Sequence, residues 1–219
     1  MFATGQPVTH EFPNLHASSH PLVAHNLTEL TDERTSSRAF RVLVRRLTTL
    51  LIYEATAHLA LAGTTYRTPM EPATGGRMSE RIGLVPILRA GLGMVEPALD
   101  ALPDAEVWHL GLYRDETTKQ PVSYYNRLPE RCPDDRIFIL DPMLATGGSA
   151  SDAVDVVKAW GAPAITFIGL IAAPEGVVRM LERHPDVPLY VAALHRQLDE
   201  HAFILPGLGD AGDRQFGTG

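Results

Sequence analysis

The chain of 219 residues contains a single cysteine, Cys132, so it can form neither an internal disulfide nor a thiolate metal site. It has no apolar run long enough to cross a bilayer, and its first residues lack the basic and then apolar pattern of a secretory signal. Structural disulfides accumulate in oxidising compartments, so a chain without them fits a reducing one. We therefore expect a cytoplasmic protein with no membrane partner.

An excess of positive charge is also missing. Lys and Arg number 19 against 26 Asp and Glu, and the formal net charge is -7. Sequence-independent binding to nucleic acid depends on Lys and Arg that neutralise phosphates, so this balance disfavours it. The densest basic run, Arg41 to Arg46, fits the exposed face of an amphipathic helix. We expect no nucleic-acid partner.

Two familiar nucleotide motifs are incomplete. A P-loop needs Lys after its second glycine, but here Gly148 is followed by Ser149, which excludes the usual ATP-hydrolysing site. The segment from Gly207 to Gly212 matches G-x-G-x-x-G, yet only seven residues follow it. That is too short for the helix and strand of a dinucleotide-binding unit.

The chain is 45% hydrophobic and 21% charged, which is ordinary for a globular protein with one core. Residues 1–20 lack apolar periodicity and are predicted to be an N-terminal extension of uncertain order, followed by one domain over residues 21–219. His16 and His20 lie four apart in this extension. Pro21 follows directly and no further ligand completes a set, so a solvated tail is preferred over a metal site.

Apolar residues at spacings of three and four predict a long N-terminal amphipathic helix over residues 36–62, with Gly63 as its stop. Its apolar stripe contains Phe40, Leu43, Val44, Leu47, Leu50 and Leu51. Residues 70–77 are rich in Pro and Gly and are predicted to be a loop.

Strand-like and helix-like segments alternate in the rest of the chain. The predicted strands cover residues 82–88, 106–113, 137–140, 164–172 and 187–194, and the predicted helices cover 92–102, 150–160 and 175–184. This order predicts an α/β fold with a doubly wound, mainly parallel five-stranded sheet flanked by helices. The polar stretch 114–130 is predicted to be a flexible loop or two-stranded arm. Ligands of such sheets bind at the carboxyl ends of the strands.

Residues 136–151 combine a strand, an acid and a glycine-containing helix start. Asp141 follows the apolar run of the strand, and Pro142 keeps it out of the helical region. The segment 145–149 can direct consecutive backbone N–H groups at an anion, with the helix dipole adding to them. An acid beside such a cradle suggests a ribose phosphate as ligand. The alternative is an ordinary strand-to-helix turn capped by Ser149.

Two arginines follow neighbouring strands at the same predicted edge of the sheet. Arg89 lies beside Gly91 and Gly93, and Arg114 ends the next strand. The planar guanidinium donates paired hydrogen bonds to phosphate, and glycines permit close backbone approach to an anion. With Asp141, these residues predict a site for a phosphorylated sugar that also carries pyrophosphate.

Six segments together resemble the uracil phosphoribosyltransferases, a type I phosphoribosyltransferase family: VPILRAGLG, YRDETTKQPV, DPMLATGGS, AAPEG, HPDV and PGLGDAGDRQFGT. The similarity runs from about His20 to Thr218. It implies transfer of ribosyl phosphate from 5-phosphoribosyl-1-pyrophosphate (PRPP) to uracil in pyrimidine salvage, giving UMP and pyrophosphate. It also implies Mg2+ held through PRPP and water rather than by protein ligands, and a homodimer or higher homo-oligomer. Activation by GTP, which some relatives show, is left open.

The resemblance also implies roles for individual residues. Asp141, Arg114 and Asp210 would be catalytic, and uracil would be bound at Ile204, Gly209, Asp210 and Ala211 in a C-terminal base-binding hood. PRPP would be bound by Arg89, Arg114, Asp141, Pro142, Met143, Leu144, Ala145, Thr146, Gly147, Gly148, Ser149 and Asp210.

Pro142 stands where several other type I relatives have a second acid, as it does in the uracil enzymes. The chain departs from the family pattern at Thr117, His195, Asp199 and Phe203, which bears on rate and regulation. Two alternatives are weighed against the main hypothesis. A regulator that binds RNA or a nucleotide on the same fold should show a basic face, and an enzyme for a purine should carry the two-acid loop.

Overall fold

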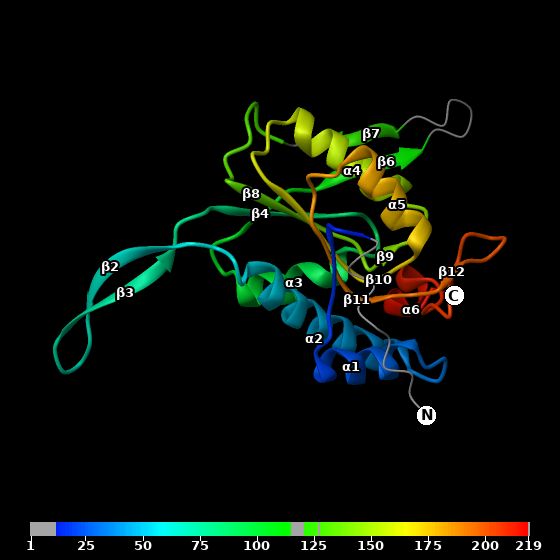
Figure 1. The fold of residues 1–219 in the computed structure, drawn as a ribbon, viewed down its shortest axis with the longest axis horizontal. Coiled ribbons are helices and arrows are strands. Elements are labelled where there is room, and N and C mark those ends of the chain that lie inside the picture. Colours follow the sequence, from blue (N-terminus) through cyan, green and yellow to red (C-terminus); the bar gives the residue numbers. More distant parts are fainter. Residues whose placement is uncertain (1–11, 115–120, 127, 219) are drawn as a thin grey trace.

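The structure is a computed structural model that describes residues 12–114, 121–126 and 128–218, with only the backbone for residues 110–114 and 121–126. Its centre is a seven-stranded parallel sheet in the order β1-β11-β10-β8-β4-β5, with β9 beside β10 (Figure 1). The strands are β1 (Leu15–Ala17), β4 (Ile82–Pro86), β5 (Glu106–Val107), β8 (Arg136–Leu140), β9 (Met143–Leu144), β10 (Ile165–Ala172) and β11 (Leu189–Leu194). The predicted α/β fold is confirmed, and β1 and β9 enlarge the predicted sheet of five strands.

Helices cover both faces of the sheet, which explains why its strands are apolar without alternation. On one face lie α1 (Pro21–Thr31), α2 (Ser37–Thr56) and α3 (Leu92–Ala101), and on the other lie α4 (Gly148–Ala159) and α5 (Pro174–Arg183). In β8, Phe138 and Leu140 belong to the first core, and Ile137 and Ile139 to the second. All four are fully buried.

The long N-terminal helix ends earlier than predicted. α2 stops at Thr56 instead of residue 62, because its apolar stripe leaves the core after Ala55. Gly63 is therefore not the helix stop and lies inside β2 (Leu61–Arg67).

The predicted loop at residues 70–77 is also wrong. Pro72–Met78 is strand β3, which pairs with β2 in an antiparallel hairpin that projects from the body (Figure 1). Neither strand alternates buried and exposed residues, because the hairpin covers no core. A pattern of burial therefore could not reveal it.

The predicted strand 106–113 is divided in two. β5 pairs with β4 in the sheet, whereas β6 (Leu110–Arg114) pairs with β7 (Pro121–Asn126) in a separate antiparallel hairpin. The division falls at Trp108, whose indole Nε1 donates to Asp134 Oδ2 at 2.7 Å. The two-stranded arm predicted in residues 114–130 is confirmed, beginning at residue 110. Thr117 lies outside the described residues.

The segment before residue 21 contributes to the fold from residue 12 onward. β1 pairs with β11, and His16 stacks on Tyr190 with ring centroids 4.5 Å apart. His20 is the N-cap of α1, because its Nδ1 accepts from the N–H of Leu22 at 3.1 Å. These two histidines are exposed, as predicted, but they belong to a strand and a helix cap and not to a tail. Helix α1 was not predicted.

The C-terminal segment 195–218, here called the hood, contains β12 (Gln197–Leu198), β13 (Ile204–Leu205) and the short helix α6 (Ala211–Phe216). α6 packs against α2 at the carboxyl edge of the sheet. Among the described residues, no helix is long and apolar enough to cross a membrane.

Candidate active site

The loop from Asp141 to Ala150 forms a small cavity at the carboxyl end of β8. The lining residues, apart from Asp141 and Ala150, are Met143, Leu144, Ala145, Thr146, Gly147, Gly148 and Ser149, around a volume of about 70 Å³. Gly147 is the N-cap of α4 with φ 73° and makes no side-chain cap. The N–H of Gly148 donates to Thr146 Oγ1 over 3.4 Å. The next N–H groups of the first turn are left for a ligand, which favours an anion at this end of the helix. Ser149 lies one residue inside the helix, so the alternative in which it caps the turn is wrong.

Glycine is required at the start of this loop for a steric reason as well. A Cβ on Gly147 would lie 2.8 Å from the carbonyl oxygen of Gly176, and a Cβ on Gly176 would lie 2.4 Å from that of Ala145. The loop therefore rests directly on the first turn of α5. This close contact fixes the position of the cradle.

Asp141 is only partly exposed, and the protein around it raises the pKa of its carboxyl group to about 7, chiefly through burial. The backbone N–H of Met143 donates to Asp141 Oδ1 at 3.5 Å and opposes that rise. The backbone N–H of Asp141 donates to the carbonyl of Ile168. The carbonyl of Pro142 accepts from the N–H groups of Leu170 and Ile171. The acid is held rigidly by the sheet while its carboxyl group is poorly solvated.

The Arg89 loop packs closely against the end of β8. A Cβ on Gly91 would lie 2.4 Å from the carbonyl oxygen of Leu140, and one on Gly93 would lie 2.0 Å from Gln215 Oε1. These two glycines therefore make room for β8 and α6. The peptide bond between Leu88 and Arg89 is cis.

Arg89 connects this loop to the hood. Its Nη2 lies 3.4 Å from Asp213 Oδ1 in α6, and the pair is largely exposed. A guanidinium in that position is free to exchange its carboxylate for a phosphate ligand. The predicted pyrophosphate arginine and the predicted base-binding segment are thus neighbours in space.

The predicted uracil residues lie around the start of α6. Ile204 and Ala211 have buried side chains, so only their backbone groups are available to a ligand. Gly209 has φ 77°, a conformation that suits glycine. Asp210 is the exposed N-cap of α6, and its Oδ1 accepts from the N–H of Asp213 at 2.9 Å.

The structure brings the predicted residues together as two neighbouring groups. Asp141 and the 143–149 loop line the small cavity, whereas Asp210 lines a second cavity of about 400 Å³ between the hood and the α1–α2 connection. Arg89 bridges toward the hood through Asp213. Arg114 is the last residue of β6, and its side chain is not among the described parts of the chain.

Comparison with known proteins agrees with this geometry. The model of the uracil phosphoribosyltransferase family matches residues 17–218. The chain belongs to this family. A uracil phosphoribosyltransferase of Roseiflexus sp. is 58% identical over 202 residues, which cover 92% of this chain and 97% of that protein. The Listeria innocua uracil phosphoribosyltransferase is 48% identical over 206 residues, covering 94% of this chain and 99% of its own. The solved structure of the AQ2163 protein from Aquifex aeolicus matches with a TM-score of 0.86 at 36% identity, covering 93% of this chain and 98% of that one.

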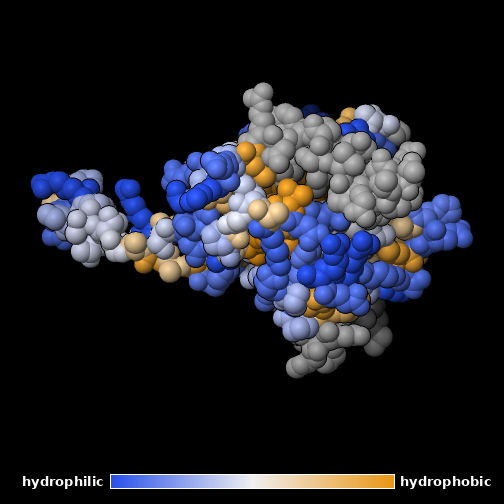
Figure 2. Space-filling model, turned by 90° about the horizontal axis from the view of Figure 1, so that it is seen from above, coloured by the Kyte–Doolittle hydropathy of each residue, from blue (hydrophilic) through white to orange (hydrophobic). Residues whose placement is uncertain are grey.

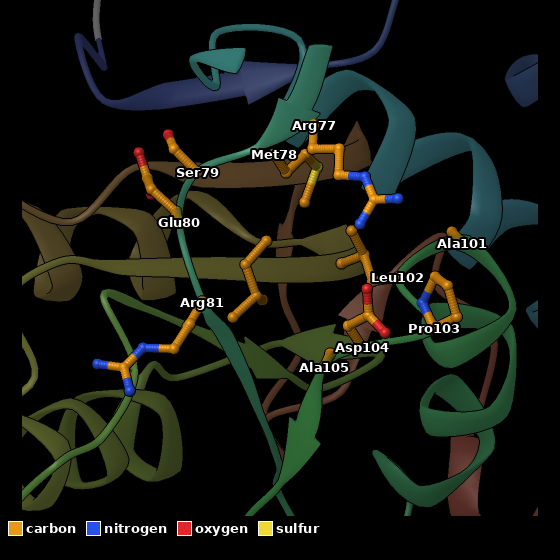
Figure 3. Close-up of a pocket in the computed structure, with 11 residues that line it drawn as sticks. Arg77, Met78, Ser79, Glu80, Arg81, Ala101, Leu102, Pro103, Asp104 and Ala105 are labelled. Atoms are coloured by element: carbon orange, nitrogen blue, oxygen red, sulfur yellow. The ribbon is translucent and has the colours of Figure 1, made fainter. Parts of the chain in front are cut away.

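In this uracil phosphoribosyltransferase family member, a larger cavity lies away from the carboxyl edge. A space of about 670 Å³ lies where β4 begins, between the end of β3 and the loop that follows α3. Arg77, Met78 and Asp104 line it, and Figure 3 shows Arg81 directed away from Arg77. Arg81 instead lies near Asp135, with Nε and Oδ2 3.7 Å apart. In parallel sheets ligands bind beyond the opposite ends of the strands, so we do not assign PRPP here.

The donor set fits a magnesium ion that arrives with its substrate. Among the described residues, no group of three or more His, Cys, Asp or Glu side chains is arranged to hold a metal. Asp141 and Asp210 each offer one carboxylate near the predicted phosphate-binding elements. Mg2+ usually combines one or two carboxylates with substrate phosphates and water, which this arrangement permits.

Sequence interpretation missed the residues that join the two halves of the site. Asp213, Arg214, Gln215 and His195 contact the Arg89 loop or the 207–209 segment. Three of them lie in the quoted motif at the C-terminus. The partners of Asp213 and Gln215, which are Arg89 and Ala90, lie more than a hundred residues away in sequence, so no local pattern indicates those two contacts.

Proposed function

We infer that this protein catalyses transfer of ribosyl phosphate from PRPP to uracil, giving UMP and pyrophosphate. The observation that carries this inference is the meeting of three elements at one edge of the sheet: the Asp141 acid with its glycine-rich helix start, Arg89, and the hood. Each element matches one part of the two substrates. Family membership over residues 17–218 supports the same reaction.

The ribose 5-phosphate is assigned to Asp141 and to the loop formed by Pro142, Met143, Leu144, Ala145, Thr146, Gly147, Gly148 and Ser149. The N–H groups at the start of α4 would bind the phosphate, because Gly147 at the N-cap has no side chain and the contact of the Gly148 N–H with Thr146 Oγ1 is long, at 3.4 Å. Asp141 would accept hydrogen bonds from the ribose hydroxyls. Its rigid backbone makes it suited to hold the sugar in one orientation.

Arg89 and Arg114 are assigned to the pyrophosphate. Negative charge grows on this group as it leaves, so guanidinium groups bind it more strongly in the transition state than in the substrate. Arg89 has a carboxylate partner, Asp213, within 3.4 Å before substrate arrives. When PRPP binds, Arg89 would exchange Asp213 for a phosphate group. The binding of PRPP would in this way be felt by the hood, which contains Asp213.

Uracil is assigned to Ile204, Gly209, Asp210 and Ala211, which would recognise it through backbone groups. The neutral base offers two carbonyls and an N–H, and cytosine reverses donor and acceptor at two of these positions. A fixed backbone would leave cytosine unpaired and would reject it. Asp210, at the N-terminus of α6, would also face PRPP or its metal shell.

Mg2+ is the proposed cofactor, held through PRPP and water beside Asp141 and Asp210. Its charge would offset the negative charge of the departing pyrophosphate. Removal of Mg2+ with a chelator should abolish turnover, and calorimetry should show that PRPP binding is lost too. Full PRPP affinity without the metal would contradict this proposal.

A second copy of the chain is the proposed partner of the β2–β3 hairpin. Leu61 and Met78 are paired at its root and are exposed, and Tyr66 is exposed further along. Figure 2 shows hydrophobic residues gathered where this hairpin joins the body. A two-stranded hairpin is marginally stable alone, and it lies beside the large cavity lined by Met78. A projecting arm next to a recess makes a surface suited to a two-fold dimer.

Three assignments rest on the resemblance or on composition alone. The division into an extension at residues 1–20 and a phosphoribosyltransferase domain at 21–219 stays a prediction. Activation by GTP is tested by adding GTP to the assay at limiting PRPP. The cytoplasm is the proposed location, supported by the single cysteine.

The reaction is tested with the purified protein, PRPP, Mg2+ and each nucleobase in turn, with products separated chromatographically. UMP should form from uracil, and no nucleotide should form from cytosine or a purine. Product from a purine alone would overturn the substrate. Saturable RNA binding at physiological salt without UMP formation would favour a regulator instead.

A further inference from the structure

The segment Gly207–Ala211, here called the base loop, is held in part by hydrogen bonds from side chains outside it. Gly207 and Gly209 both have positive φ, 74° and 77°, and glycine is the residue with the most backbone freedom to lose. The base loop connects the two-residue strand β13 to the short helix α6. Two side chains from outside the loop contact its backbone.

His195 holds the beginning of the base loop. Its Nδ1 accepts a hydrogen bond from the N–H of Gly207 at 3.1 Å. The backbone N–H of His195 donates to Ala172 at 2.8 Å, at the end of β10. Through His195, Gly207 is therefore held at a fixed position relative to the carboxyl edge of the main sheet.

Arg214 holds the next residue from the other side. Its Nη1 donates to the carbonyls of Leu208 and Leu30, both at 2.9 Å, and its Nη2 donates to that of Asp32 at 2.6 Å. The guanidinium also lies over the ring of Phe40, 4.6 Å from its centroid. Carbonyls at the end of α1 carry the negative end of a helix dipole, which favours a cation here. Arg214 therefore ties the base loop to α1 and α2.

We propose that His195 and Arg214 are positioning residues that set the affinity for uracil by holding the base loop. The proposal rests on the assignment of uracil to this loop. The two hydrogen bonds engage Gly207 and Leu208, the residues that directly precede Gly209. The backbone groups of Gly209 that read the base are thus placed from two directions. Small displacements of such groups weaken recognition strongly.

The test measures kcat and the KM values for uracil and PRPP in four variants. His195→Ala and Arg214→Ala should raise the KM for uracil about tenfold, with the KM for PRPP changed less than about twofold. His195→Asn should restore much of the affinity, because its Oδ1 can accept from Gly207. Arg214→Lys should not, since one ammonium cannot span the carbonyls of Leu208 and Asp32 as the planar fork does.

Arg41→Ala is the matched control. It removes a hydrogen bond of 2.8 Å to the carbonyl of Gln215 in the same helix without touching the base loop. Its KM for uracil should be unchanged. Equal rises in both KM values, or no rise in either alanine variant, would overturn the proposal. If Arg214→Ala does not fold, as judged by its melting curve, the His195→Ala and His195→Asn pair decides.

Gly209→Ala separates failure of this proposal from failure of the assignment beneath it. The new Cβ would be strained by the positive φ and would lie 3.6 Å from Arg214 Cδ. A normal KM for uracil in this variant would remove uracil from the base loop. A raised KM for uracil in Gly209→Ala, with normal values in the His195 and Arg214 variants, would leave uracil at the base loop. It would reject only the positioning role of His195 and Arg214.

Discussion

Asp141 carries a cost in stability that its proposed role in binding would explain. Its pKa is raised to about 7 in the folded chain, against an ordinary value of 3.8, because the carboxylate is poorly solvated. A folded pKa above the unfolded one means that the folded state is favoured when the group is protonated. The stability from this group is present below about pH 4 and is lost as the pH rises toward 7. Near neutral pH the ionised Asp141 therefore lowers the free energy of unfolding of the ligand-free protein.

We expect Asp141→Asn to reduce turnover about 100-fold, because the carboxylate no longer accepts from the ribose hydroxyls. The same variant should melt at a higher temperature than the parent at pH 8, and the gap should close by about pH 4. Assays and thermal melts across this range check both outcomes.

Asp134→Asn is the control, since Asp134 has a pKa raised by burial but lies before the opposite end of β8. The amide can still accept from Trp108, so turnover should stay normal. Full activity in Asp141→Asn would remove the role assigned to Asp141.

At the scale of elements, α4 has a glycine in the left-handed region at each end, and the two differ in what surrounds them. Gly147 has φ 73° and lies against Gly176, whereas Gly161 has φ 93° and nothing lies within 4 Å of its Cβ position. The first end belongs to the proposed phosphate cradle. The second ends the helix on the surface.

Gly147→Ala should therefore raise the KM for PRPP about tenfold, because the new Cβ forces the cradle away from α5. Gly161→Ala carries a similar backbone penalty of about 1 kcal/mol but should leave that KM unchanged. Steady-state kinetics and denaturant unfolding of both variants separate cradle geometry from stability. Equal effects on the KM would show that α4 transmits strain along its length.

At the scale of the whole molecule, the β2–β3 hairpin stands away from both cores and exposes Leu61, Tyr66 and Met70. Exposed apolar residues on a projecting element indicate an interface when they lie together. The proposed two-fold dimer would cover the root of the hairpin.

Leu61→Asp should weaken the dimer, since it places a charge among apolar residues at the root of the arm. Light scattering after size-exclusion chromatography, over a range of concentrations, should show a shift toward monomer. Val178→Asp on α5 is the control, because Val178 is also exposed but lies on a helix far along the chain from the hairpin. A parent protein that is monomeric at all concentrations would reject the dimer.

The sequence by itself determined the alternation of buried strands and helices, and with it the parallel sheet. Those elements have strong local signals: β8 is a continuous apolar run, and α2 has an apolar stripe with a helical period. The same local signals located Asp141 and the glycine loop at a strand end. The family followed from motifs spread over nearly the whole chain.

Only the tertiary structure decided the features that depend on distant partners. The β2–β3 hairpin has no buried face, so its strands carry no periodic pattern. β1 exists because β11 offers it an edge, and His20 is a cap because α1 begins beside it. Arg89 meets Asp213, and Arg214 meets Leu30, across more than a hundred residues of sequence. Local composition records propensity, whereas these contacts are set by which surfaces the folded chain brings together.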